Sequence, residues 1–536
     1  MKKLFFTKAI ALSILFCSAN TFTQAQAPNI QWHKCVGGSG DEYFQNVIKL
    51  HDGNYLFFGA TASTDGDLKA KHGGNDAFLL KTNGAGNIIW KKTYGGSGDD
   101  FFNYVVETSN GNLYAIGNST SNDGQVHGNH GGDIYGDVWI VKTNCNGNFL
   151  QQHCYGGSGD ELAFDAILTC DNKIAFTGWS SSNDGDVSGN HGDYDAWIVK
   201  LKSNGSIKFS TMLGDTGYDD MSAIHEINGQ YIVTGTKASV PSTTDHLENY
   251  YDAHAALLDN SGNIIWYHTY GGTRSDDGNF SVLTNDGNCV ITGHTSSNDG
   301  DVPDNVGFNS WVWKIDVANN GNIIWQTHFG VVNDTAAGFS VFPTHDGGFV
   351  VVGAIAPNEE APFSTWDAYM GKVDADGTLL WTKQFGGSDF DALSGGVEEG
   401  DNSLLISGYT FSNDGDVSGN HGNTDCWMVN LSAAGARISE GSGSPFEKSE
   451  VGTGWKTYPN PFSTSTTISF SLSQSQNVSL KVYDVNGRLI KTLASTIFEE
   501  GEHQIVWNAE EVNAGIYFLK MQAVEFLKTE KLIVTK

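Results

Sequence analysis

The stretch Trp90-Lys91-Lys92-Thr93-Tyr94-Gly95-Gly96-Ser97-Gly98-Asp99-Asp100 returns in altered form along most of the 536-residue chain. Its centre, Gly-Gly-Ser-Gly-Asp, and the degraded copies of it begin at Gly37, Gly95, Gly156, Gly214, Gly271, Gly330 and Gly386. An aromatic residue precedes each copy, and successive copies start 56 to 61 residues apart. Self-similarity at a fixed period indicates a repeat architecture, here over about residues 30–438.

Each repeat divides into four strand-like runs joined by loops. In the clearest copy the runs are Phe102–Thr108, Leu113–Ser119, Val138–Lys142 and Phe149–Tyr155. Asn-Gly and Asp-Gly turns between β-rich runs are typical of hairpins, because both residue types tolerate positive φ. A helical solenoid is excluded, since no repeat holds a 3.6-residue apolar stripe of ten residues. Four antiparallel strands per repeat predict an all-β, seven-bladed β-propeller over residues 26–438.

The phase of the repeat predicts how the ring closes. The chain opens with a fourth-strand sequence at Ile30–Gly37, and its last propeller strand is a third-strand sequence, Cys426–Leu431. The N-terminal strand is therefore expected to complete the last blade, which removes exposed sheet edges. Cys35 and Cys426 fall on these two strands, so the sequence leaves two alternatives open, a clamping disulfide or two free buried thiols. Cys145–Cys170 is a weaker candidate pair.

The composition excludes several classes of partner and site. The chain has 61 acidic and 30 basic residues, a net charge of −31, and three arginines, Arg274, Arg437 and Arg488. This balance argues against nucleic acid and against docking on an anionic membrane. A sialidase, which holds its substrate with an arginine cluster, is excluded, and no GxSxG, HExxH or Walker A motif occurs.

Three long loops share one spacing of acidic residues, with a second Asp two residues after the first and a third eleven residues after it. These candidate ligands are Asp65, Asp67, Asp76, Asp184, Asp186, Asp195, Asp414, Asp416 and Asp425. A histidine follows the first Asp by seven residues, at His72, His191 and His421. Hard oxygen ligands on a Gly-rich loop suit Ca²⁺. The alternative is that Asp and Asn cap turns through nearby backbone N–H groups, with His as a structural hydrogen-bond partner. Both interpretations stay open.

The two ends of the chain have compositions of their own. Met1-Lys2-Lys3, an apolar stretch and small residues around Ala25 predict a signal peptide over residues 1–25. No later segment has the roughly 18 apolar residues that a transmembrane helix needs. Residues 439–453, rich in Gly, Ser and Glu, are expected to be a flexible linker. Residues 454–536 hold seven short strand-like runs, which suit a small immunoglobulin-like sandwich.

Two resemblances add to this interpretation. The repeat phrases, with Asp195-Ala196-Trp197-Ile198-Val199-Lys200, resemble the seven-bladed β-propeller repeat of bacterial surface proteins. The tail resembles the C-terminal sorting domain of the type IX secretion system of Bacteroidetes, and the residues that carry the likeness include Tyr458, Pro459, Asn460, Pro461, Gly487, Gly515 and Lys536. The second resemblance implies export across the outer membrane, removal of the tail, and release or attachment to surface lipopolysaccharide.

The sequence therefore predicts a secreted or cell-surface binding or scaffold module with a glycan or protein ligand. The alternative is an extracellular carbohydrate-processing enzyme that uses the acidic face, although catalysis needs one asymmetric site rather than several near-copies. Repeats four and six depart from the loop pattern at Ser239–Asn249 and Ala356–Ser364. If the acidic face holds a singular ligand site, it is expected near these two repeats.

Overall fold

The computed structural model describes residues 27–433 and 456–535, except 70–71, 133, 239–250, 304, 306, 331–334, 357–364, 461, 473–475, 485–488, 500, 510–511 and 523–526. Within these ranges the regular structure is β-strand, apart from one 3₁₀ helix, η1 (Val317–Asn319). The all-β prediction is therefore confirmed. The chain divides into two compact units, residues 1–437 and 438–536. The predicted signal peptide and linker lie outside the described residues.

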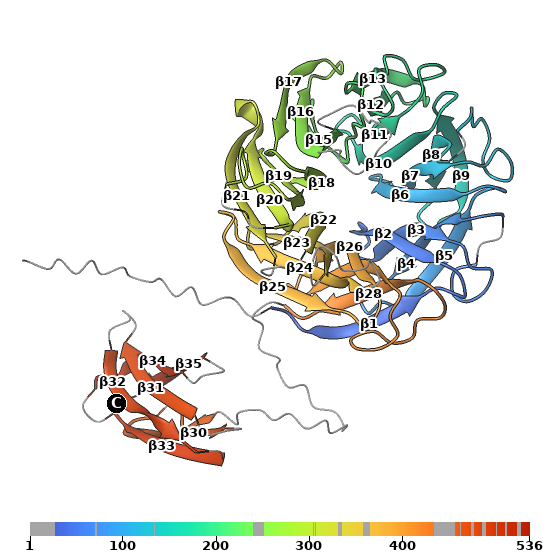
Figure 1. Cartoon of the computed structure of the whole chain (residues 1–536). Helices are drawn as coiled ribbons and strands as arrows, with labels where there is room; N and C mark the ends of the chain where they lie inside the picture. The colour runs from blue at the N-terminus through green and yellow to red at the C-terminus, as the bar shows by residue number, and fades with distance from the viewer. Residues whose placement is uncertain are drawn as a thin grey trace, which may run out of the picture. The chain divides into compact units, whose positions relative to one another are not determined.

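The first unit consists of repeated four-stranded antiparallel sheets arranged around a common centre (Figure 1). Its strands are β1 (Ile30–Val36), β2 (Glu42–Lys49), β3 (Tyr55–Thr61), β4 (Asp76–Thr82), β5 (Ile88–Tyr94), β6 (Asp100–Glu107), β7 (Leu113–Ser119), β8 (Asp137–Thr143), β9 (Phe149–Tyr155), β10 (Glu161–Leu168), β11 (Ile174–Ser180), β12 (Asp195–Leu201), β13 (Ile207–Leu213), β14 (Ala223–Ile227), β15 (Gln230–Ala238), β16 (Tyr251–Leu258), β17 (Ile264–Tyr270), β18 (Asp276–Leu283), β19 (Cys289–Thr295), β20 (Asn309–Asp316), β21 (Asn322–Phe329), β22 (Thr335–Pro343), β23 (Phe349–Ala356), β24 (Asp367–Val373), β25 (Leu379–Phe385), β26 (Asp391–Glu398), β27 (Leu404–Thr410) and β28 (Asp425–Leu431).

Six of the sheets in the described part of this unit run in chain order, from β2-β3-β4-β5 to β22-β23-β24-β25. The seventh has the order β1-β28-β27-β26, so it joins the beginning and the end of the unit. The first strand of each repeat, such as β6 or β18, lies at the inner edge of its sheet, and the fourth lies outside (Figure 1). Each sheet therefore presents its first strand to the centre of the ring.

The aromatic residues that precede the repeat phrase, apart from the exposed Phe149, pack between neighbouring sheets. Trp90 on β5 covers the turn of the next sheet, where a methyl group added to Gly147 would lie 2.7 Å from the indole. Further in, the third-strand tryptophans Trp139 and Trp197 are fully buried. One core cluster joins Leu56 and Phe58 of one sheet to Trp139 of the next. Burial of such large rings is the main source of cohesion between adjacent sheets.

Of the two alternatives for Cys35 and Cys426, the structure has two free thiols and not a disulfide, with Cys426 buried and Cys35 half-buried. In the antiparallel pair of β1 with β28, Cys35 faces Trp427, and Cys426 faces Val36. Neighbouring positions on a strand point to opposite sides of the sheet, so the two sulfur atoms lie on different faces. Cys35 accordingly packs with one core cluster and Cys426 with another. The weaker candidates, Cys145 and Cys170, are also free.

The second unit contains two antiparallel sheets. Its strands are β29 (Lys456–Tyr458), β30 (Ser465–Leu472), β31 (Gln476–Asp484), β32 (Leu489–Phe498), β33 (Gly501–Asn508), β34 (Gly515–Gln522) and β35 (Leu527–Val534). The sheet orders are β29-β30-β33 and β32-β31-β34-β35. One core contains Phe470 and Trp507 from the first sheet and Val482 and Leu519 from the second. The two sheets therefore pack against each other through a shared apolar layer.

Candidate functional site

The first Asp of each predicted calcium loop caps the neighbouring glycine-rich loop. Asp65 Oδ1 accepts the Ser39 N–H at 2.8 Å, and the matching carboxylates, Asp184 and Asp414, accept from Ser158 and Ser388, each at 2.7 Å. These three aspartates are exposed. A side-chain oxygen that accepts a nearby backbone N–H is the usual reason for Asp in a turn. The loops before the first and third strands are thus tied together at one end of the ring.

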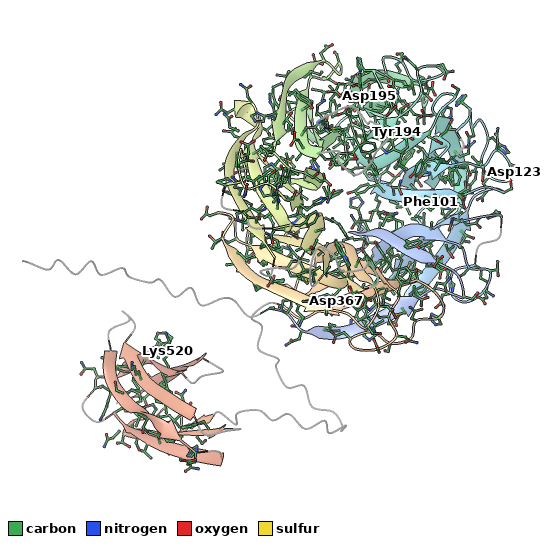
Figure 2. The ribbon with its side chains drawn as sticks, viewed as in Figure 1. Phe101, Asp123, Tyr194, Asp195, Asp367 and Lys520 are labelled. Carbon is green, nitrogen blue, oxygen red and sulfur yellow. The ribbon has the colours of Figure 1, made fainter. Side chains whose placement is uncertain are left out.

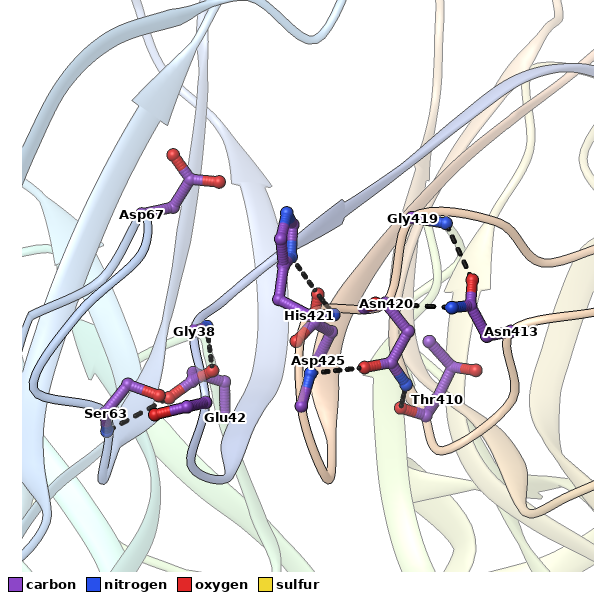
Figure 3. A network of polar contacts seen from close by, with 12 residues as sticks. Gly38, Glu42, Ser63, Asp67, Thr410, Asn413, Gly419, Asn420, His421 and Asp425 are labelled. Carbon is purple, nitrogen blue, oxygen red and sulfur yellow. Dashed lines mark hydrogen bonds and ion pairs between the residues drawn. The ribbon is translucent and has the colours of Figure 1, made fainter.

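The third Asp of each loop is buried at the start of a third strand and holds the loop histidine. His72, His191 and His421 place Nδ1 at 2.8, 2.8 and 2.6 Å from Oδ2 of Asp76, Asp195 and Asp425. Figure 3 shows the last of these pairs in its hydrogen-bonded network. The prediction of histidine as a structural hydrogen-bond partner is confirmed.

Each buried third-strand carboxyl also faces an acid on the next sheet. Gly37 stands between Glu42 Oε2 and Asp425 Oδ1, and an added methyl group would touch both oxygens. Equivalent glycines bring together Asp137 with Glu161, Asp195 with Asp219, Asp252 with Asp276, and Asp367 with Asp391. Burial raises the pKa of Glu161 to about 7, and the charge of Asp137 adds to this shift. Carboxyl pairs, with at least one partner buried, therefore recur where neighbouring sheets meet.

The structure does not gather the three carboxylates of one loop around a point. Asp67 lies 3.3 Å from Lys91 Nζ, and Asp186 and Asp416 are exposed. Across the described ranges, no group of three or more His, Cys, Asp or Glu side chains is placed to hold a metal ion. Calcium binding by these loops stays a prediction.

Removal of calcium gives a direct test of the loops. We expect a chelator to leave the unfolding midpoint unchanged. The first Asp of each loop, such as Asp65, already accepts a backbone N–H, and the third, such as Asp76, is already hydrogen-bonded to a histidine. Thermal unfolding with EDTA, and again after Ca²⁺ is restored, measures the effect. A midpoint that falls on chelation and recovers with Ca²⁺, but not with Mg²⁺, would establish calcium sites in the loops.

A cavity of about 600 Å³ occupies the centre of the ring. It is lined by Gln45, Asn46, Phe101, Asn103, Tyr104, Asn118, Tyr135, Leu162, Phe164, Asp220, Ser222, Asn279, Phe280, Phe339, Ser340, Ser394 and Tyr409. Most of these residues come from the inner strands β2, β6, β10, β18, β22 and β26, while Asn118 and Tyr409 lie on second strands, Asp220 and Ser222 directly precede β14, and Tyr135 lies in a long loop. Figure 2 labels Phe101 at the inner side of the ring, on β6. We call this cavity the central pocket.

A β-bulge in the first strand aims a side chain into the central pocket. The register shifts between Phe44 and Asn46 on β2, and again between Ala163 and Asp165 on β10. The skipped residues, Gln45 and Phe164, line the pocket. The same occurs on β6, β18, β22 and β26, which present Asn103, Asn279, Phe339 and Ser394. Bulges re-aim side chains in this way next to functional sites.

A glycine in each second strand makes room for the bulge. A methyl group on Gly178 would overlap the carbonyl oxygen of Leu162, two residues before the bulged Phe164. The equivalent glycines Gly59, Gly117, Gly293, Gly353 and Gly408 each lie against a first-strand carbonyl, while Gly235 lies against the carbonyl of Asp220, just before β14, a strand without a bulge. Glycine inside a strand marks such a close backbone approach. This repeated glycine was the sequence signal that could have predicted the bulges, which the sequence analysis missed.

Two aromatic rings meet across the centre of the ring. Tyr104 and Phe280 each stand one residue beyond the bulge of its strand, on β6 and β18, and their ring centroids are 6.5 Å apart. Asn118 and Tyr135, joined by an Asn118 Nδ2 to Tyr135 O bond of 2.9 Å, line the pocket from the loop side. The central pocket therefore lies at the end of the ring that carries the long acidic loops.

Asp220 is the one carboxylate among the described residues that line the central pocket. Its Oδ1 accepts the Ser222 hydroxyl at 2.9 Å and the Thr236 N–H at 3.3 Å. Burial raises the pKa of Asp220 to about 6, and hydrogen bonds from Ser222 and Tyr218 partly offset the shift. Asp220 precedes β14, in the irregular fourth repeat where a singular site was expected.

The predicted sorting residues lie at the edges of the second unit. Asn460 Oδ1 accepts the Ile533 N–H at 2.9 Å, and Phe462 exchanges backbone bonds with Ile533 and Thr535. Tyr458 ends β29 and Gly515 begins β34. Pro461, Gly487 and Lys536 lie outside the described residues. The opening motif is therefore joined to the last strand, β35.

No helix in the described ranges is long and apolar enough to cross a membrane. None of the curated proteins matches the chain. Among solved structures, a fungal alcohol oxidase of the AA5 family in complex with copper is similar at 12% identity, with 96% of this chain and 100% of that one covered and a TM-score of 0.42. An α-L-arabinofuranosidase from Fusarium graminearum has 11% identity, coverage of 64% and 98%, and a TM-score of 0.40. Drosophila Semaphorin 2a has 8% identity, coverage of 95% and 99%, and a TM-score of 0.41.

These structural similarities carry no argument about function. For the tail, in contrast, a family model matches: residues 456–535 match the model of the secretion system C-terminal sorting domain. This match agrees with the type IX sorting domain that the Tyr458–Lys536 motifs predict. Residues 456–535 are therefore a type IX sorting domain, which implies export across the outer membrane to the cell surface or the extracellular space.

Proposed function

We propose that the protein is an extracellular binding module that the type IX system exports and that holds its ligand in the central pocket. The observation that carries the proposal is the pocket of about 600 Å³, built from inward-facing side chains on successive sheets. Cavities of this size with a few convergent polar groups are typical small-ligand sites. The sorting domain supports delivery to the outside of the cell.

The proposal includes a seven-bladed β-propeller as the scaffold. The recurring four-stranded sheets support it, as does the pairing of β1 with β28, which leaves the first and last strands of the unit in one sheet. The tail is proposed to be an immunoglobulin-like sandwich, supported by its two packed sheets. After export we expect removal of the tail and release of the product or its attachment to lipopolysaccharide.

A carbohydrate-processing enzyme is the second candidate, because Asp220 has the raised pKa that a general acid needs. Glycoside hydrolysis ordinarily requires two carboxyl groups on either side of the scissile bond. The charge of Asp277 contributes to the raised pKa of Asp220, but Asp277 Oδ2 lies 3.0 Å from His294 Nε2 and Asp277 is not among the described pocket-lining residues. Binding without turnover is therefore the better supported function.

Deletion of residues 454–536 tests the export half of the proposal. We expect the truncated protein to accumulate in the periplasm, since the sorting domain is absent, while the full chain reaches the cell surface or the medium. Fractionation with immunodetection measures the distribution, and residues 454–536 fused to a periplasmic reporter provide the control. Normal surface display of the truncated chain, or a reporter that stays in the periplasm, would contradict the sorting role.

A further inference from the structure

The lining of the central pocket is almost uncharged, although the chain as a whole is strongly acidic. Its rim and walls combine aromatic rings with side-chain amides, and no lysine or arginine occurs among the described lining residues. The rings belong to Phe101, Tyr104, Tyr135, Phe164, Phe280, Phe339 and Tyr409, and the amides to Gln45, Asn46, Asn103, Asn118 and Asn279. Flat apolar faces and neutral donors and acceptors therefore converge on one space.

We infer that the central pocket binds the end of a neutral oligosaccharide, an inference that rests on the proposed binding function. A sugar ring offers an apolar C–H face and an edge of hydroxyl groups that both donate and accept hydrogen bonds. Aromatic rings match the face, and amides, which carry a donor and an acceptor in one group, match the hydroxyls. The pocket volume of about 600 Å³ is in the range of small-ligand sites.

The bulge residues are the best placed to contact such a ligand. Asn103 and Asn279 donate Nδ2 to the carbonyl oxygens of Ala163 and Gly338, each at 2.8 Å, which fixes each amide and leaves its oxygen as an acceptor. Phe164 and Phe339 are half-buried and belong to none of the core clusters of the described residues. Rings that the core does not use are free to stack on a ligand.

Other ligand classes fit the described pocket less well. An anionic ligand would need arginine or lysine, and Asp220 would repel it. A lipid chain would leave several amides without partners, which is costly in an apolar contact. A quaternary amine could use the rings, but the Asp220 carboxyl already accepts from Ser222 and Thr236, and its pKa of about 6 makes it a weak counterion in mild acid.

The test is a binding screen on the full chain with short neutral oligosaccharides of hexoses and pentoses. Their sialylated and sulfated counterparts, choline and a mixed peptide library are screened beside them. We expect saturable binding of a neutral glycan without product formation. Phe164→Leu, which keeps an apolar side chain but loses the ring face, is expected to weaken binding about tenfold, while Phe164→Tyr retains it. Phe149→Leu, on the outer strand β9, is the matched control.

The outcomes separate this inference from the proposed function. Binding of a peptide, choline or an acidic glycan that Phe164→Leu weakens would overturn the neutral-sugar inference and keep the pocket as a binding site. Glycan binding that Phe149→Leu weakens and Phe164→Leu does not would overturn the pocket itself. A lack of binding by every probe would overturn both, and product release from the glycan would replace the binding module with an enzyme.

Discussion

Gly178→Ala is expected to destabilise the first unit by about 3 kcal/mol, the upper end of the usual cost of overpacking. The added methyl group would overlap the Leu162 carbonyl oxygen, which belongs to backbone and cannot rotate away. Gly178 pairs with Ala163, directly before the bulge that presents Phe164. Relief of the overlap therefore requires a shift of the whole inner strand β10.

Urea unfolding of the full chain measures this loss, and the transition of the first unit is followed by tryptophan fluorescence. Gly400→Ala is the control, because a methyl group there meets nothing within 4 Å and its φ lies outside the left-handed region. Glycan binding, measured under conditions where the variant is still folded, should also weaken, since the bulge aims Phe164. Equal stabilities of the Gly178→Ala and Gly400→Ala proteins would mean that the second-strand glycine does not support the bulge.

The strands of the repeat could be predicted from sequence because their signals are local. Leu113–Ser119 and Phe149–Tyr155 have the bounds that the hairpin turns and β-rich runs indicate. The first strand was predicted two residues short at its start, since Asp100 and Phe101 belong to β6. Asp100 looked like part of the acidic loop, whereas its carboxyl is buried and accepts the Ser121 hydroxyl at 3.0 Å.

Cys35 and Cys426 do not face each other, because the pairing of the third and fourth strands contains a bulge. In the first repeat, Ala77 and Thr93 are the counterparts of Cys426 and Cys35, and a register shift between Lys81 and Thr82 places Ala77 opposite Tyr94 instead of Thr93. The pair of β1 and β28 has a comparable shift between Ile30 and Trp32. If the pairs are counted from Ile30 and Leu431 without this extra residue, every later pair is wrong by one position. In a strand, one position moves a side chain to the other face.

The central pocket could not be predicted by the same means. It depends on the convergence of inner strands from distant parts of the chain, and its lining differs between repeats, with Gln45, Phe164 and Ser394 at equivalent places. The conspicuous pattern, the acidic loops, has in large part a structural role. Residues that recur in every repeat are those that the fold of each sheet requires. Residues that differ between repeats at one inward-facing position are better candidates for ligand contact.

Asp425→Asn is expected to stabilise the protein at pH 8 and to give no gain at pH 4. Asp425 Oδ1 is buried, has no hydrogen-bond partner among the described residues, and faces Glu42 across the junction with β2. Burial raises the pKa of Asp425, the bond from His421 opposes this, and the charge of Glu42 adds to it. An Asn side chain keeps an oxygen for His421 and turns an N–H toward Glu42.

The direction of the pH effect follows from proton linkage. A carboxyl whose pKa is higher in the folded state contributes its stability in full below its unfolded pKa, near 3.8 for Asp, and loses it as the pH rises through the folded value. His225 and His254, whose pKa values burial lowers to about 4, act in the opposite sense between that value and 6.5. Both histidines are present in wild type and variant, so the difference between the two proteins isolates the carboxyl.

The chain already contains a neutral version of this junction. Between β20 and β22 the two acidic positions are taken by Asn309 and Ala336, which both adjoin Gly330. Unfolding curves for Asp425→Asn are therefore expected to show a gain at pH 8 of about 1 kcal/mol, the lower end of the cost of a buried polar group without a partner, and this gain disappears toward pH 4. Asp416→Asn, on the exposed part of the same loop, should show no such pH dependence. If Asp425→Asn is equally stabilising at both pH values, or destabilising at pH 8, the buried carboxyl pair does not oppose folding at neutral pH and its charges must be balanced locally.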